Sequence, residues 1–373
     1  MKLTYLNLIL LLISFSCSDA PKETSIQEQT TQEESFELVP LKWAKNFRIK
    51  KYQSHQVVEL LNNGEIYQTF TISSSYTPVN KHTTHFNTPL SNIASASCVY
   101  TKIFDELGAL NTIKGIDQLT FQYSSNVVDY VNSNKILEFH SGEGLKTEEL
   151  FILNPQVLFT WSSNQSNQQI KKLIKLGIPV IFASSYLENH PLARAEWIKF
   201  FSLFVDKYDE AHAYFKTIES KYLELTKTQS SQQKLILLNA PYSGQWYLPT
   251  GNSYMGNLLK DSNFKLFLQD STSTGAQAFT FEDVIAHHQN AEFWINPSFY
   301  ESRSQILETD SRYNQLNAFN TNRVYNAIKR KRINGGNDYW EQGVIRPDLI
   351  LKDLIHIYNQ DHTDSLYFFT KLD

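Results

Sequence analysis

Cysteine is scarce in this sequence, with only Cys17 and Cys98 among 373 residues. Two cysteines cannot form the disulfide framework of a small secreted scaffold, and Cys98 has no partner if Cys17 carries another group. A surplus of positive charge is also absent, because 34 Lys and Arg residues face 38 Asp and Glu residues for a formal net charge of −4. This balance argues against a nucleic-acid-binding protein with a basic stripe.

Only the N-terminus carries an extended apolar run, residues 3–15, between Lys2 and Cys17. The run is shorter than the roughly 20 residues of a membrane-spanning helix, and its flanking residues predict a secretory signal. A cysteine at the cut site is typical of a bacterial lipoprotein, whose mature chain begins at a lipid-modified Cys17, although Ser14 and Phe15 depart from the usual pattern. The alternative is an ordinary cleaved signal with a chance cysteine. Both interpretations predict an exported protein.

Catalytic motifs are missing as well. The sequence contains no Gly-x-Ser-x-Gly elbow, no His-Glu-x-x-His and no phosphate-binding Gly-x-x-x-x-Gly-Lys. No pair of carboxylates is placed for glycoside hydrolysis. An exported hydrolase remains one alternative, which turnover of a chromogenic ester or glycoside would reveal.

Two close histidine pairs raise a second alternative, a site for a bare zinc or manganese ion. They are His82 with His85, and His287 with His288. The first pair lies in a polar, strand-rich stretch and the second lies late in a predicted helix, so we interpret both as solvated and predict no metal site.

The chain begins its folded part after a polar segment. Residues 18–40 are rich in Glu, Gln, Thr and Ser and cannot bury enough apolar surface to order themselves, so we expect a flexible tether. Short apolar bursts follow over residues 47–72, with Asn62-Asn63-Gly64 between two of them. This pattern predicts a β-hairpin or meander.

Short β-branched runs then alternate with helical periods. One series contains a helix over residues 147–154, a strand over 157–160, a helix over 168–176 and a strand over 179–182, and a second series fills residues 235–358. Such units imply mostly parallel sheets with helices on their faces.

Between the two series, apolar residues recur at spacings of three and four from Trp197 to Leu225. We predict one helix at about 192–204 and a second at about 206–228, capped by Asp206. This order predicts an α/β fold of two Rossmann-like lobes joined by a single long rigid helix. The predicted segments are a signal peptide (1–16), a tether (17–40), an N-terminal β extension (41–90), an N-terminal lobe (91–205), an interlobe helix (206–228), a C-terminal lobe (229–360) and a C-terminal tail (361–373).

Several long stretches resemble one known family, over nearly the whole chain from Trp43 to the C-terminus. They are residues 45–52, 175–180, 190–200, 246–255, 337–341 and 346–354. They are similar to the substrate-binding lipoproteins of ABC importers for iron-siderophore complexes, haem and cobalamin. The resemblance implies the class III periplasmic binding protein fold, with a ligand held in the cleft between the lobes, no catalysis and no resident cofactor.

The resemblance also implies a way of docking, because in this family one surface glutamate on each lobe meets arginines of the permease dimer. The matching positions here are Glu148 and Glu282. An acid in the first turn of a helix is stabilised by the helix dipole and stays exposed for a bidentate arginine. The alternative is that each acid serves only its own helix.

Ligand-binding residues are expected where the strand ends of the two lobes face each other. The candidates are Ser97, Tyr123, Trp161, Trp246, Tyr247, Gln277, Arg303 and Trp340. Aromatic planes with an arginine suit a large, flat and often anionic ligand. For each aromatic the alternative is core packing, for Ser97 it is helix capping, and for Arg303 it is a surface role.

The predicted function is therefore that of a lipid-anchored, periplasm-facing protein. It captures an iron-siderophore, haem or cobalamin-like ligand and delivers it to an ABC permease dimer in the inner membrane. A third alternative is a cell-surface protein that hands its ligand to an outer-membrane receptor.

Overall fold

The computed structural model describes residues 34–75, 83–142, 144–228, 232–297, 299–333, 335–361 and 365–373. Contacts divide the chain into two compact units, residues 1–35 and residues 36–373, and the sheets and helices belong to the second unit. The signal peptide, Cys17 and most of the tether lie outside the described residues. Within those residues, no helix combines the length and the apolar character that crossing a bilayer requires.

The N-terminal extension is a five-stranded sheet in the order β1-β2-β3-β4-β5. Its strands are β1 (Glu37–Leu38), β2 (Phe47–Lys51), β3 (Gln56–Asn62), β4 (Glu65–Ser73) and β5 (Thr84–Asn87). Asn63 and Gly64 join β3 to β4 with φ values of +50° and +86°. Both central residues of a type I′ turn need positive φ, so the predicted hairpin is confirmed and its turn chemistry is explained.

Two buried glutamates fasten this extension to the helices that follow the first lobe. The Glu196 carboxylate accepts the backbone N–H groups of Lys42, Trp43 and Ala44 at 2.7–3.1 Å. Glu188 accepts those of Lys45 and Asn46 at 2.9 and 2.8 Å. Burial raises the pKa of Glu188, and its hydrogen bonds oppose that rise. The segment 42–46 is thus held by its main chain, and the side chains of Lys42 and Trp43 add bonds to Glu219 at 2.7 and 2.6 Å.

The first lobe contains a fully parallel sheet in the order β12-β11-β6-β7-β8. Its strands are β6 (Ile93–Ser95), β7 (Ile113–Ile116), β8 (Leu137–Glu138), β11 (Val157–Trp161) and β12 (Val180–Ala183). Its helices are α1 (Cys98–Glu106), α2 (Ser125–Asn134), α3 (Thr147–Leu153) and α4 (Gln168–Lys175), with a small hairpin of β9 (His140–Ser141) and β10 (Gly144–Leu145). Apolar clusters cover both faces of the sheet, as a parallel sheet requires.

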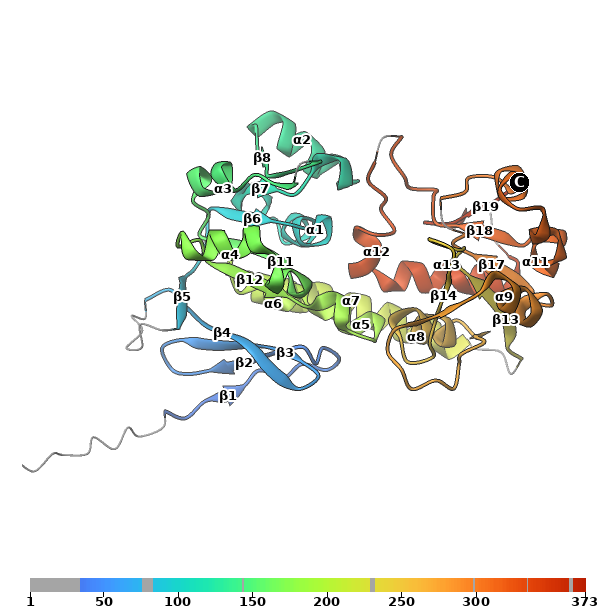
Figure 1. Ribbon diagram of the computed structural model, residues 1–373. Coiled ribbons are helices and arrows are strands. Elements are labelled where there is room, and N and C mark those ends of the chain that lie inside the picture. Colours follow the sequence, from blue (N-terminus) through green and yellow to red (C-terminus); the bar gives the residue numbers. More distant parts are fainter. Residues whose placement is uncertain are drawn as a thin grey trace, which may run out of the picture. The chain divides into compact units, whose positions relative to one another are not determined.

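Three helices lead to the second lobe: α5 (Pro191–Glu196), α6 (Ile198–Ser202) and α7 (Tyr208–Leu225). The long helix α7 contacts α6, which precedes it in the chain, and α13 of the second lobe, which follows it (Figure 1). Its buried residues Ala211, Phe215, Ile218 and Tyr222 follow the expected spacing. The predicted cap is wrong, because Asp206 has φ +54° and Lys207 occupies the cap position.

The second lobe repeats the plan with the sheet order β15-β13-β17-β18-β19. Its strands are β13 (Lys234–Leu238), β15 (Phe264–Lys265), β17 (Phe293–Ile295), β18 (Val324–Asn326) and the antiparallel β19 (Thr370–Lys371), beside a hairpin of β14 (Trp246–Pro249) and β16 (Ala276–Phe279). Its helices are α8 (Tyr254–Asp261), α9 (Phe281–His288), α10 (Arg303–Thr309), α11 (Asn317–Asn320), α12 (Gln342–Ile345) and α13 (Pro347–Asn359).

The C-terminal residues, which we expected to form a tail, belong to this lobe. They supply β19, and Phe368, Phe369 and Leu372 are buried. Three large apolar side chains over five residues have more to gain from the core than from solvent.

Candidate functional site

A cavity of about 310 Å³ lies where strands of the first sheet end. Ala96, Asp117 and Trp161 line it, and they stand at the carboxyl ends of β6, β7 and β11. Trp161 and Phe121 present their rings with 41% and 50% of their surfaces exposed. Because the carboxyl ends of parallel strands meet at one edge, this cavity occupies the usual ligand position of an α/β sheet.

Polar groups share this first cavity with the two aromatics. His140 Nδ1 lies 3.7 Å from an Asp117 carboxylate oxygen and 3.2 Å from the amide nitrogen of Gln118. Burial raises the pKa of Asp117, and His140 partly offsets that rise. The first-lobe half of the site therefore combines two exposed rings with hydrogen-bonding groups that include a His–Asp pair.

A second cavity, of about 420 Å³, lies at the matching edge of the other sheet. Asn239, Asn296 and Asn326 line it at the carboxyl ends of β13, β17 and β18. Asn239 and Asn296 adopt φ values of +61° and +53°. Asparagine tolerates this left-handed conformation better than most residues, which lets each strand turn sharply out of the sheet.

Exposed aromatic rings dominate the second cavity. Tyr242, Tyr247, Phe299 and Trp340 line it, and their exposed fractions run from 43% for Tyr247 to 85% for Phe299. Lys331 adds a cation, which pairs with Glu301 at 2.8 Å. A group of large apolar rings left in solvent marks a binding surface, because most such rings are buried.

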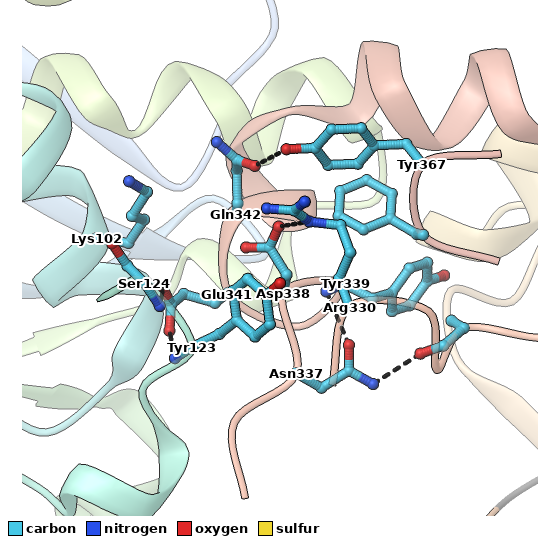
Figure 2. A network of polar contacts seen from close by, with 12 residues as sticks. Lys102, Tyr123, Ser124, Arg330, Asn337, Asp338, Tyr339, Glu341, Gln342 and Tyr367 are labelled. Carbon is cyan, nitrogen blue, oxygen red and sulfur yellow. Dashed lines mark hydrogen bonds and ion pairs between the residues drawn. The ribbon is translucent and has the colours of Figure 1, made fainter. Parts of the chain in front are cut away.

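A third cavity, of about 630 Å³, adjoins the site where the second lobe reaches the first. First-lobe residues that include Leu119, Thr120 and Gln122 line one side, and residues 331–333 and 335–336 line the other. Figure 2 shows the polar contacts beside it, in which Glu341 of the second lobe meets the first lobe at Tyr123 and Ser124. The two halves of the site are therefore connected by direct contacts.

Three of the predicted ligand residues lie exposed in these cavities: Trp161, Tyr247 and Trp340. Tyr123 lies between the lobes, with the Arg330 guanidinium 5.1 Å from its ring. Gln277 is exposed on β16, where it pairs with Leu248, outside the first and second cavities.

The other three predicted ligand residues face elsewhere. Trp246 is fully buried, and its indole N–H donates to the Leu238 carbonyl at 2.8 Å, so we assign it to the core. Ser97 is also buried, and it makes no capping hydrogen bond through its side chain. The Arg303 guanidinium stacks over the Phe319 ring at 4.5 Å and donates to the Phe319 carbonyl at 2.8 Å. Trp246 and Arg303 are corrected for one reason, which is that each side chain is engaged by its own lobe, whereas Ser97 is corrected because it is buried.

The two glutamates implied to dock are both exposed in first helical turns, Glu148 in α3 and Glu282 in α9. Their surroundings differ. Glu282 pairs with Arg312 at 2.7 Å, and the Arg312 guanidinium stacks over the Phe281 ring at 4.0 Å. Glu148 forms no ion pair with any residue that the structure describes.

The sequence interpretation missed several lining residues. Phe121, Tyr242 and Phe299 are large aromatic residues in polar loops that follow strands, and this pattern could have identified them as lining residues. Lys331 belongs to the run Lys329-Arg330-Lys331-Arg332, an obvious basic cluster that lies just after β18. No group of three or more His, Cys, Asp or Glu side chains within the described ranges is placed to hold a metal ion, and His82 lies outside those ranges.

Comparison with known proteins agrees with this architecture. A family model described as "Periplasmic binding protein" matches residues 93–330. An uncharacterized lipoprotein of Methanocaldococcus jannaschii is 26% identical over 285 residues, which cover 74% of this chain and 66% of that lipoprotein. The chain therefore spans slightly less than two thirds of this relative's length.

Solved structures share the fold at low sequence identity. A possible iron-binding (periplasmic solute-binding) protein from Staphylococcus epidermidis matches with a TM-score of 0.57 and 16% identity, covering 73% of this chain and 99% of that one. The periplasmic vitamin B12 binding protein of Vibrio cholerae matches with a TM-score of 0.53 and 12% identity, covering 73% and 98%. The predicted α/β fold is confirmed.

Proposed function

Because this chain belongs to the periplasmic binding protein family, whose model matches more than half of it, we propose that it is the substrate-binding component of an ABC importer. One observation carries the proposal: each lobe has a cavity at the carboxyl edge of its sheet, and exposed aromatic rings line both cavities. A pair of such half-sites suits a ligand held between the lobes and released unchanged. The relative reported above is described as a lipoprotein and the two structural neighbours as binding proteins, which supports binding without catalysis.

The proposed ligand is an iron-siderophore, haem or cobalamin-like molecule. Six exposed rings over two cavities offer flat, apolar surface for a large ligand, and Lys331 offers a charge to an anionic group. The descriptions of the two structural neighbours, an iron-binding and a vitamin B12 binding protein, point to the same class.

The proposal includes an anchor and a partner. We propose that Cys17 carries lipid and holds the exported protein at the membrane, as the lipoprotein relative suggests. We further propose that Glu148 and Glu282 dock onto the permease dimer, because both are exposed in first helical turns, one in each lobe.

Ligand binding is tested with the full chain by titrating its tryptophan fluorescence with haem, cyanocobalamin, a ferric tris-catecholate and a ferric trihydroxamate. We expect saturable quenching by at least one of them, because Trp161 and Trp340 are exposed in the cavities. The saturable quenching should disappear when both tryptophans are replaced by Phe, while ligand binding measured by equilibrium dialysis persists. Failure of all four compounds to bind would contradict the proposed ligand class.

Docking is tested in vesicles that contain the permease and its ATPase. Replacing Glu148 and Glu282 by Ala should leave ligand binding intact and abolish uptake. Glu149, exposed beside Glu148, and Glu308, exposed on α10, provide the matched control pair for the same replacement. Uptake that survives in the Glu148/Glu282 variant would refute the docking assignment.

A further inference from the structure

A segment of the second lobe crosses to the first lobe and packs against its backbone. We call residues 330–333 and 335–341 the strap. A Cβ atom on Gly336 would lie 2.4 Å from the carbonyl carbon of Gln122, and one on Gly335 would lie 2.0 Å from the carbonyl oxygen of Thr120. Only residues without a side chain fit at this distance, so the strap and the first lobe touch main chain to main chain.

One carboxylate fastens the strap. Glu341 is completely buried, and its two oxygens accept the backbone N–H groups of Tyr123 and Ser124, the latter at 2.9 Å (Figure 2). These two residues immediately precede α2, so their N–H groups belong to the electropositive start of that helix. The partners are 218 and 217 residues apart in the chain, and each bond joins the two lobes.

The rest of the strap is braced mainly on its own lobe. Arg330 Nε donates to Asp338 at 2.6 Å, and the Asn337 amide donates to the Ala327 carbonyl at 2.7 Å (Figure 2). The strap therefore moves with the second lobe. Its polar bonds to the first lobe are the two that Glu341 accepts and a long one, at 4.0 Å, from the Cys98 thiol to the Trp340 carbonyl.

The closed contact carries two penalties that its opening would relieve. The Gln122 side chain is completely buried, and its amide oxygen and nitrogen have no hydrogen-bond partner among the described residues. Burial also raises the pKa of Glu341 to about 7, against the opposing effect of its two N–H donors. Buried groups of this kind are expensive to keep from water. Opening the contact would return both groups to water and relieve both penalties.

Charged and titratable groups surround Glu341 from two sides. Four of them belong to α1, namely Cys98, Lys102, Asp105 and Glu106, and two belong to the strap, Arg330 and Asp338. Lys102 favours the ionised form of Glu341, and Asp338 disfavours it. Lys102 is itself paired with Asp105 and Glu106 at 2.7 Å each, so burial remains the dominant influence.

We propose that Glu341 is a positioning residue that locks the strap onto the first lobe and so sets how far the two halves of the cleft can separate. Lys331, Asn337 and Trp340 belong both to the strap and to the second cavity. The lock therefore fixes the distance between these residues and the first cavity. The inference goes beyond the proposed function, and its test requires no ligand.

The lock responds to pH with a definite sign. A Glu341 carboxyl withdrawn into water has its ordinary pKa of 4.5, while the locked one has a pKa of about 7. At a pH between these two pKa values, locking therefore takes up a proton, and a lower pH favours the locked state. By linkage, lowering the pH from 8 to 6 should favour locking by about tenfold. Below the ordinary value both states are protonated, and the effect ends.

Hydrogen–deuterium exchange of the full chain tests the lock directly, because Tyr123 and Ser124 donate its two N–H groups. After correction for intrinsic exchange rates, protection of residues 119–124 should rise about tenfold from pH 8 to pH 6. Glu341→Gln, which cannot ionise, should remove this pH dependence. Glu341→Ala should lower protection at least tenfold at both pH values.

Gly336→Ala provides a second variant that leaves the carboxylate in place. Its new methyl group would collide with Gln122, so it should lower protection of residues 119–124 as Glu341→Ala does. Gly142→Ala is the matched control, because a Cβ there meets no atom within 4 Å. The core strand β11 serves as the reference segment and should exchange equally in all variants.

Two results would overturn the inference. One is unchanged protection of residues 119–124 in Gly336→Ala and Glu341→Ala. The other is a tenfold pH response that persists in Glu341→Gln. If Glu341→Ala also deprotects β11, its fold is lost, and Gly336→Ala and Glu341→Gln decide the question by the same criteria.

Discussion

The two halves of the cleft share a backbone plan and differ in their chemistry. Each lies at the carboxyl edge of a parallel sheet, but the first-lobe half offers two exposed rings and the His140–Asp117 pair. The second-lobe half offers four exposed rings and Lys331. We call the first-lobe half the polar wall and the second-lobe half the aromatic wall. The proposed ligand should turn its hydrogen-bonding groups to the first lobe and its flat or anionic part to the second.

The difference between the halves is sharpest for two tryptophans that the sequence treats alike. Trp246 is buried in the second lobe, and Trp161 is exposed in the first. We expect Trp246→Ala to lower the free energy of unfolding by about 3–5 kcal/mol, because it empties a packed site. Trp161→Ala should change it by less than about 1 kcal/mol. Urea denaturation followed by circular dichroism measures both, and equal losses would break the comparison.

Ligand affinity should divide in the opposite way. Trp340→Ala should weaken binding by about 2 kcal/mol, or roughly thirtyfold, because it removes an anchoring ring of the aromatic wall. Trp161→Ala should cost about 1 kcal/mol, since it leaves the polar groups of its wall in place. Titration with whichever compound binds in the fluorescence experiment measures the effect.

Phe36→Ala provides the control for this experiment, because Phe36 is an exposed ring on the N-terminal extension. Its affinity should equal that of the unaltered chain. A larger loss from Trp161→Ala than from Trp340→Ala would reverse the assignment of the two walls.

The smallest expected effect concerns the two exposed glutamates. Glu282→Gln should lower the urea midpoint slightly, and added salt should remove the difference, because the Glu282–Arg312 pair is solvent-exposed. Glu148→Gln should leave the midpoint unchanged at any salt concentration, since Glu148 has no ion-pair partner in the described part of the chain. A salt-dependent change at Glu148 would show that the lobes are alike here.

The fold could be predicted because its signals are local. The Asn63-Gly64 turn, the alternation of strands and helices, and the spacing of apolar residues along α7 each depend on neighbouring residues. One local prediction failed because the backbone conformation of a residue overrode its preference for the helix cap position. Asp206 is a good cap by type, but its positive φ excludes it from that position.

The site was only partly predictable because it depends on orientation and on distant contacts. Trp246 and Tyr247 are adjacent in β14, and alternation puts one in the core and the other in the cleft. Sequence alone does not say which. The Arg303 guanidinium donates a hydrogen bond to the Phe319 carbonyl of its own lobe. The bond from Glu341 to Tyr123 spans more than two hundred residues and leaves no periodic trace in the sequence.

The fastening of segment 42–46 has a mechanical consequence. A force applied to the chain at its N-terminal side would first load the short β1–β2 pairing and then reach Glu196 and Glu188, which accept main-chain hydrogen bonds in and beside α5. The load would pass into the helical spine between the sheets and bypass the strand ends that line the cleft. Tension from that end would therefore leave the two cavities undistorted.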